Sequence, residues 1–309
     1  MLDVRRLRVL REVAARGSFS AAAEALSFTQ SAISQHVAAL ERETGTKLVE
    51  RGSRGIRLTD AGQSLVKHAD SILGRIEDAE EELAAIAGLR GGRLRLACFQ
   101  SAGATLVPRA VAEFHRRHPD VELSMIEAEP EEAEAALRAG EIDLALVYDF
   151  APIPSVRDGE LDTVRLVDDP YDAIVPKGHR LAGRRSLSLA DLAEEPWVAA
   201  TTGCGCRQIT ERACQDAGFE PHIAFECDET LAAQALVAAG VGVTILPRLA
   251  LATIHPGVEV RRLTRKDQVI RRIWAAREDG AYRSPASEAM VQILLDVAED
   301  FRSATLEAA

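Results

Sequence analysis

Residues 18–59 read SFSAAAEALSFTQSAISQHVAALERETGTKLVERGSRGIRLT, and this stretch decides the fold of the N-terminal part of the chain. Ser20 is expected to cap a short alanine-rich helix and Thr29 a second helix, because hydroxyl oxygens accept hydrogen bonds from free amides at helix starts. In the second helix, apolar side chains recur at helical spacing from Ile33 to Leu40, and the polar residues fall on other faces. Two helices joined by a tight turn, the second with one apolar stripe, are typical of a helix-turn-helix.

The segments on either side complete a small domain. An apolar repeat that runs from Leu7 to Ala14 and stops at Gly17 predicts a first helix. Residues 47–59 predict two short strands joined by a turn. The arginines that project from this predicted hairpin are Arg51, Arg54 and Arg57. The sequence therefore predicts a winged helix-turn-helix with a basic wing.

The pattern changes after Thr59, where apolar residues recur at alternating spacings of four and three. The stripe consists of Leu65, Ala69, Ile72, Ile76, Ala79, Leu83 and Ile86. This heptad repeat predicts one long helix over 59–90, of about 45 Å at 1.5 Å per residue. A partner helix would bury the stripe and make the segment a dimerising linker; the alternative is a helix packed on the body of its own chain.

Beyond Gly92, apolar strands alternate with amphipathic helices in two successive series, which predicts an α/β body built on parallel sheets. Two series imply two subdomains with a cleft between them. We place the first at about 91–160 and 268–309 and the second at about 161–267.

Three later segments are expected to return to the first subdomain. The strands VEVRRL (258–263) and VIRRIWAAR (269–277) should cross back to it. An apolar stripe from Ala286 to Phe301 predicts a C-terminal helix packed on it.

Charge is distributed unevenly along the 309 residues. The net charge is −11, but residues 1–60 hold ten Lys/Arg against seven acidic residues, which makes them +3 and the remainder −14. A basic end on an acidic body fits a chain that places one domain on phosphates. No apolar run reaches the length of a membrane span, and charges interrupt the apolar positions of the N-terminal segment, unlike the central region of a signal peptide. We therefore expect a cytoplasmic protein with no membrane partner. Five cysteines do not make a disulfide framework, and reduced thiols are expected.

Residues 18–65 strongly resemble the winged helix-turn-helix of LysR-type transcriptional regulators. The resemblance continues through LVPRAVAEFHRRHPDVEL (106–123), GEIDLALV (140–147) and LVAAGVGVTILP (236–247), so it spans essentially the whole chain. It implies a winged helix-turn-helix DNA-binding domain at 1–58, a dimerising linker helix at 59–90 and a periplasmic-binding-protein-like effector domain at 91–309. It also implies a homotetramer that binds double-stranded DNA.

Matching to the family's recognition helix assigns Gln30 and Gln35 to base edges, and Ser34 to a base or a phosphate. The predicted DNA-contacting residues are Ser18, Ser20, Gln30, Ser31, Ser34, Gln35, His36, Arg51 and Arg54. Dimerisation would place two such helices on a palindromic operator. The alternative is that these residues only solvate a helix face.

In the family's fold, the first strand of each subdomain leads to a helix whose N-terminus faces the cleft. Here those places are CFQSAGA (98–104) and TTGCGCR (201–207), where amides and hydroxyls could hold a small, anionic effector. The predicted effector-binding residues are Gln100, Ser101, Ala102, Glu129, Tyr148, Thr201 and Thr202, with Asp149 as a further candidate. The alternative is that the hydroxyls only cap helices.

Cys204, Cys206 and Cys214 leave three interpretations open. They could line the ligand site, form a redox switch or bind a metal. The region loosely resembles the peroxide-sensing branch of the family, but Gly205 stands where that branch has its first thiol. If Cys206 and Cys214 share a helix, about 12 Å of rise separates them, whereas a disulfide requires Cα atoms within about 7 Å. C-x-C with seven residues to the next cysteine is not a common zinc pattern, and we predict no metal.

The rival functions are an enzyme and a solute-binding protein on the same α/β body. A solute-binding protein would need an export signal, and we expect none here. No nucleophile elbow or glycine-rich phosphate loop supports the first, so we predict no catalytic residues and no cofactor.

Overall fold

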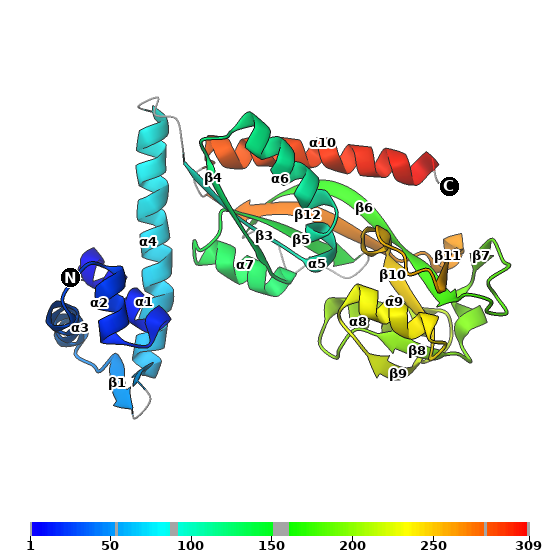
Figure 1. Cartoon of the computed structure of the whole chain (residues 1–309), viewed down its shortest axis with the longest axis horizontal. Helices are drawn as coiled ribbons and strands as arrows, with labels where there is room; N and C mark the ends of the chain where they lie inside the picture. Colours follow the sequence, from blue (N-terminus) through cyan, green and yellow to red (C-terminus); the bar gives the residue numbers. More distant parts are fainter. Residues whose placement is uncertain (1, 53–54, 87–91, 151–160, 281–282, 308–309) are drawn as a thin grey trace.

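The computed structural model describes residues 2–52, 55–86, 92–150, 161–280 and 283–307. The N-terminal domain is built from α1 (Val4–Arg16), α2 (Phe19–Ala25), α3 (Gln30–Thr44), β1 (Val49–Gly52) and β2 (Gly55–Leu58) (Figure 1). β1 and β2 pair antiparallel, with Val49 opposite Leu58, so the predicted hairpin is confirmed.

Local capping explains most of these helix ends. α1 ends at Gly17, whose φ of 63° lies in the left-handed region that glycine favours. α3 begins after Thr29, whose Oγ1 accepts a hydrogen bond from the Ala32 amide at 3.2 Å, as predicted. The predicted cap at Ser20 is wrong, because α2 starts before it and Ser18 is the N-cap residue.

The core of this domain follows the predicted apolar stripes. Ile33, Val37 and Leu40 of α3 are buried, and they face α1, where Leu7 and Leu10 are buried. Burial of one stripe fixes how α3 is rotated about its axis. The opposite, polar side of α3 is therefore turned away from the core.

The long helix α4 (Asp60–Ile86) divides the predicted heptad stripe between two environments. Ala69 is fully buried in a cluster with α1 residues. Farther along the same stripe, Ile72 is 38% exposed and Leu83 66% exposed. The side chain of Ile86 lies outside the described residues. The start of α4 thus packs on its own domain, and its middle contacts the body, where Arg75 pairs with Glu278 at 2.6 Å and Glu77 pairs with Arg93. The alternative of a helix packed on its own body is therefore met in part, while Ile72 and Leu83 stay uncovered within the described chain.

The C-terminal body surrounds a sheet with strand order β4–β3–β5–β12–β6–β11–β7, and β10 also pairs with β6. The strands are β3 (Arg93–Cys98), β4 (Glu122–Glu127), β5 (Leu144–Phe150), β6 (Leu161–Pro176), β7 (Ser186–Leu187), β10 (Thr244–Pro247), β11 (Val258–Leu263) and β12 (Ile270–Glu278). β8 (Pro196–Ala199) and β9 (His222–Glu226) form a separate pair. The helices are α5 (Gln100–Gly103), α6 (Leu106–Arg117), α7 (Pro130–Arg138), α8 (Gly205–Asp216), α9 (Thr230–Ala238) and α10 (Pro285–Glu307), with short 3-10 turns η1 (Leu189–Leu192), η2 (Arg248–Leu251) and η3 (Arg265–Asp267).

Two subdomains share this sheet. β3, β4 and β5 are parallel to one another and carry α5, α6, α7 and α10, whereas α8 and α9 lie with β8, β9 and β10 at the other end (Figure 1). β6 and β12 are long strands that pair antiparallel and link the two ends. The return of β12 to the first subdomain is confirmed. The predicted return of 258–263 is wrong, because β11 pairs with β6 and β7 in the second subdomain.

One apolar core runs beneath both subdomains. Its largest fully buried side chains include Trp197, Tyr171, Phe99 and Phe114, and α10 contributes Met290. Because the core is continuous along β6 and β12, the two subdomains are anchored to the same pair of strands. None of the helices among the described residues combines the length and the apolar content that a membrane span requires.

Candidate functional site

The outer side of α3 presents the polar residues singled out from the sequence. Gln30, Ser31 and Gln35 are exposed, and Ser34 and His36 are half-buried. A glutamine amide can donate and accept hydrogen bonds in the same plane, which matches the edge of an adenine in the major groove. The helix therefore offers a face that can read bases.

The predicted positioning residues lie around this face to different degrees. Ser18 is half-buried at the start of α2, and Ser20 is exposed within α2. Arg57 on β2 is exposed. The side chain of Arg51 and the whole of Arg54 lie outside the described residues.

A cavity of about 770 Å³ opens between the two subdomains. Its walls come from α5, β5 and β12 on one side and from β8, β10 and the starts of α8 and α9 on the other. The predicted residues that line it are Gln100, Ser101, Glu129, Tyr148, Thr201, Cys204 and Cys206. The lining does not include Ala102, Thr202, Cys214 or Asp149; Ala102 is fully buried, and Asp149 pairs with Arg272 at 2.6 Å.

A buried ion pair lies at the floor of this cavity. Arg271 of β12 is 3% exposed and donates to Asp169 of β6, itself 0% exposed, at 2.6 Å. The same guanidinium donates to Ser101 Oγ at 2.7 Å. Its central carbon lies 4.7 Å from the ring centroid of Phe99 and 4.9 Å from that of Tyr148. We did not single out Arg271 from the sequence, although a pair of arginines inside an apolar strand is an unusual pattern.

Cys206, in the first turn of α8, faces the same floor. Its Sγ lies 3.5 Å from the Tyr171 hydroxyl and 3.6 Å from the Tyr148 hydroxyl. The Cys204 thiol donates a hydrogen bond that, more than any other contact, lowers the pKa of Cys206 to about 5. Arg271 and the two hydroxyls lower the pKa further, against the effect of burial. Cys206 can therefore be a thiolate at neutral pH.

The other cysteines do not share this environment. The same hydrogen bond that lowers the pKa of Cys206 raises the pKa of Cys204. Cys214 is fully buried, and burial raises its pKa to about 12. Cys206 and Cys214 both lie on α8, so the rise of the helix separates them as the sequence indicated. Among the described residues, no three His, Cys, Asp or Glu side chains are grouped as metal ligands.

The hydroxyls expected to hold an anion are used inside the protein. Thr201 donates to Asp228 through both its amide and its Oγ1, each at 2.8 Å. Thr202 Oγ1 donates to Glu226 at 3.3 Å. These carboxylates lie on β9 or directly after it, far along the chain from the 201–207 segment, so no local pattern in the sequence indicated them.

Carboxylates dominate the charge around the cavity. Those that line it are Glu127, Glu129, Glu131, Glu132, Asp228 and Glu229. The pKa of Glu129 is raised by desolvation, although the Tyr148 hydroxyl donates to it at 2.7 Å. Arg271, the lining residue that carries positive charge, is already paired with Asp169. Acidic side chains therefore outnumber basic ones among the described residues that line the cavity.

Known proteins resemble this chain over both parts. Residues 4–63 match the family model described as "Bacterial regulatory helix-turn-helix protein, lysR family", and residues 87–299 match the "LysR substrate binding domain". A probable HTH-type transcriptional regulator, LrrA, from Synechococcus elongatus is 33% identical over 302 residues, covering 98% of this chain and 99% of the relative.

A second curated relative and a solved structure also match most of the chain. A probable hydrogen peroxide-inducible genes activator from Mycobacterium avium is 34% identical over 250 residues, covering 79% of this chain and 78% of that protein. The solved structure of a full-length OxyR variant from Pseudomonas aeruginosa has a TM-score of 0.74 at 24% identity, covering 97% of this chain and 95% of that one, and it supports the fold alone. The two family models and the full-length relatives establish that this chain belongs to the LysR family of helix-turn-helix transcriptional regulators.

Proposed function

We propose that this regulator binds operator DNA as an assembly of identical subunits and that a small molecule in the cleft controls its action. The observation that carries the DNA-binding part is the exposed amide face of α3, held outward by the buried stripe on its opposite side. A helix-turn-helix dimer places two such faces on half-sites related by two-fold symmetry. The operator is therefore an inverted repeat.

The exposed apolar side chains of α4 support the assembly. Ile72 and Leu83 are large, exposed apolar side chains of one predicted stripe on a helix whose start packs on its own domain and whose middle is ion-paired with the body. A heptad stripe on a second copy of α4 would cover them. The linker helix is thus the proposed dimer contact, and contacts between bodies would complete a tetramer.

For the ligand, the charges of the cleft argue against the anionic effector that the sequence suggested. An anion in this cavity would approach six carboxylates, and the hydroxyls of Thr201 and Thr202 already donate to protein carboxylates. The aromatic rings of Phe99, Tyr148 and Tyr171 offer an apolar surface. The proposed effector therefore has an apolar body and a positively charged group such as an amine.

Phenethylamine and 3-phenylpropanoate provide a matched test of this charge preference. The amine is expected to raise the melting temperature of the full chain in a concentration-dependent manner, because a ligand that binds only the folded state stabilises it. The carboxylate, of similar size, should have no effect. Glu131→Gln/Glu132→Gln should reduce the shift, since both carboxylates line the cavity, whereas Glu299→Gln on α10 should not. A larger shift with 3-phenylpropanoate would contradict the proposal.

A second candidate is a thiol-based response at Cys206. The observation that favours it is the convergence of two tyrosine hydroxyls, Arg271 and Cys204 on one sulfur that lines the cavity. A hydroperoxide that entered the cleft would be attacked by the thiolate at its terminal oxygen: the S–O bond forms, the O–O bond breaks, and the departing alkoxide takes a proton from water, which leaves a sulfenic acid and an alcohol. Attack of the Cys204 thiol on the sulfenic acid would then form a disulfide and release water.

Alkylation by iodoacetamide measures the state of Cys206 directly. A thiol with a pKa of about 5 is already ionised above pH 6, so its alkylation rate should change little between pH 6 and 9. An ordinary thiol with a pKa near 8.5 should react about tenfold faster for each pH unit gained below that value. Cys204→Ala should restore the ordinary profile, because it removes the largest contribution to the low pKa.

The Cys214→Ser variant is the matched control and should keep the flat profile. The thiol candidate fails if Cys206→Ser retains the rapid alkylation, or if the rate in the unaltered protein rises tenfold per pH unit. Mass spectrometry of the alkylated peptide assigns the site in each case.

A further inference from the structure

A second concave surface, of about 650 Å³, lies at the far edge of the sheet, beside β7 and β11. Among the described residues, its lining holds no carboxylate but five arginines: Arg184, Arg185, Arg261, Arg262 and Arg265. We call this surface the arginine groove. Its composition is the opposite of that of the cleft, although the chain as a whole carries a net charge of −11.

The groove forms where two strands separate. β7 pairs with β11 only at Ser186 opposite Arg262 and at Leu187 opposite Leu263. Before Ser186 the chain departs from β11, and the Arg261 guanidinium spans the gap by donating to the Ala182 carbonyl at 2.8 Å through Nε. The floor of the groove is therefore the gap between β11 and the segment before β7, and the Arg261 side chain spans this gap.

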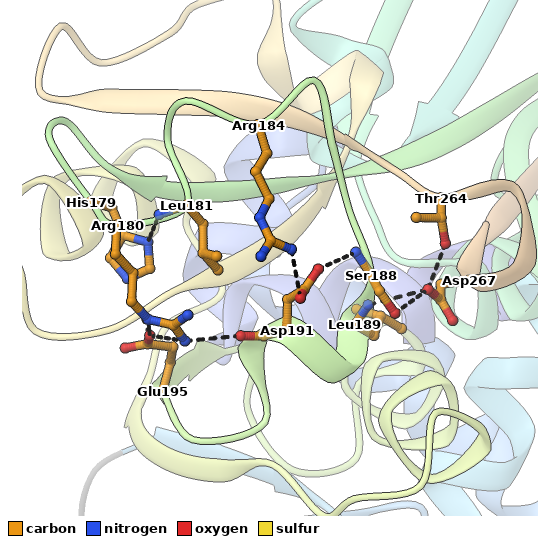
Figure 2. A network of polar contacts seen from close by, with 10 residues as sticks. All are labelled: His179, Arg180, Leu181, Arg184, Ser188, Leu189, Asp191, Glu195, Thr264 and Asp267. Carbon is orange, nitrogen blue, oxygen red and sulfur yellow. Dashed lines mark hydrogen bonds and ion pairs between the residues drawn. The ribbon is translucent and has the colours of Figure 1, made fainter.

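Polar contacts hold the two walls together, as Figure 2 shows. Asp267 accepts hydrogen bonds from Ser188 Oγ at 2.8 Å and from Thr264 Oγ1 at 2.6 Å, which ties the turn after β11 to the segment after β7. Arg184 pairs with Asp191 at 2.7 Å on the other side of Ser188. The walls are therefore fixed before any ligand binds, which reduces the entropy lost on binding.

The positive charge of the groove is only partly neutralised. Arg184 is paired with Asp191, and Arg261 with Glu259 at 3.0 Å. Arg185 and Arg265 are exposed and form no ion pair with any residue that the structure describes. These two guanidinium groups stand on opposite walls, one before β7 and one after β11.

We propose that the arginine groove binds a small ligand that carries two or more phosphate groups. Guanidinium groups form bidentate hydrogen bonds with phosphate oxygens, and each phosphate brings more than one negative charge into a region of several cations. Only Ala182, Val260 and Leu263 give the groove an apolar lining, so a ligand with a large apolar body would gain little there. This site is separate from the cleft and takes a ligand of opposite charge.

Titration calorimetry of the full chain with sodium pyrophosphate tests the proposal. Arg185→Ala/Arg265→Ala should weaken binding by about tenfold or more, because charge-assisted hydrogen bonds on both walls are lost. Arg109→Ala/Arg116→Ala removes the same charge from exposed positions on α6 and should leave the affinity within about twofold, as expected for a screened, distant charge. Circular dichroism confirms that each variant is folded.

Three outcomes would overturn the proposal. They are an absence of saturable pyrophosphate binding, equal weakening in the two double variants, and unchanged binding in Arg185→Ala/Arg265→Ala. Tighter binding of a hexaglutamate peptide than of pyrophosphate would overturn the assignment to phosphate. Operator binding should be the same in all variants, so the outcome does not depend on the role proposed for α3.

Discussion

Asp169→Ala is expected to lower the free energy of unfolding of the C-terminal body by about 3–5 kcal/mol, the usual cost of breaking a buried ion pair. The carboxylate is 0% exposed and accepts from Arg271 at 2.6 and 3.2 Å and from the Leu249 amide at 3.1 Å. Its removal takes away the carboxylate that is hydrogen-bonded to the buried Arg271 guanidinium. It also removes the hydrogen bond that joins β6 to η2.

Urea unfolding followed by tryptophan fluorescence measures this change, since Trp197 and Trp274 both lie in the body. Asp300→Ala is the matched control. Asp300 pairs with Arg109 at the same 2.6 Å, but this pair is at the surface, where the Asp300 side chain is 65% exposed and the Arg109 side chain 55%. Exposed pairs of this kind contribute about 0–1 kcal/mol. A loss below about 1 kcal/mol in Asp169→Ala would show that the ion pair does not stabilise the body as described.

The N-terminal domain could be predicted closely because its signals are local. Gly17 and Thr29 mark helix boundaries through their own backbone and side chain, and the stripe from Ile33 to Leu40 determines which face of α3 is buried. The one error, the cap at Ser20, is a shift of two residues between neighbouring serines. Helix ends of this kind are the least certain part of a sequence-based interpretation.

The body was harder to predict because its decisive contacts join distant parts of the chain. Apolar periodicity indicated strands at 258–263 and 269–277 but not their partners, so the expectation that 258–263 crosses back to the first subdomain was wrong, although the bounds 161–267 placed it in the second. Asp169 and Arg271 are 102 residues apart, and neither is distinguished by local pattern alone.

The cleft shows the same limitation. The sequence correctly brought Ser101, Tyr148 and Thr201 to one cavity, because each lies within or shortly after a strand of the α/β body. The sequence did not predict the role of the Thr201 hydroxyl, which donates a hydrogen bond to Asp228. A hydroxyl near a helix start indicates a hydrogen-bond donor. Only the fold shows whether that hydroxyl already donates to a carboxylate of the protein instead of to a ligand.

Gln30→Ala/Gln35→Ala is expected to abolish operator recognition while leaving the body intact. Each bidentate contact from an amide to a base contributes about 1–3 kcal/mol of discrimination, and a dimer presents every contact twice. The combined loss should reach at least about a hundredfold in affinity, even at the lower limit for each contact. Both side chains are exposed, so their truncation removes no packing from the core. Gln215→Ala, an exposed glutamine on α8, controls for the substitution itself.

The most direct test is fluorescence anisotropy of the full chain with duplex DNA from upstream of its own reading frame, at fixed and stated salt. The unaltered protein and Gln215→Ala should bind it far more tightly than scrambled duplex and protect two inverted half-sites. Gln30→Ala/Gln35→Ala should bind both duplexes equally weakly. If that variant retains the affinity and preference of the unaltered protein, α3 does not read the operator.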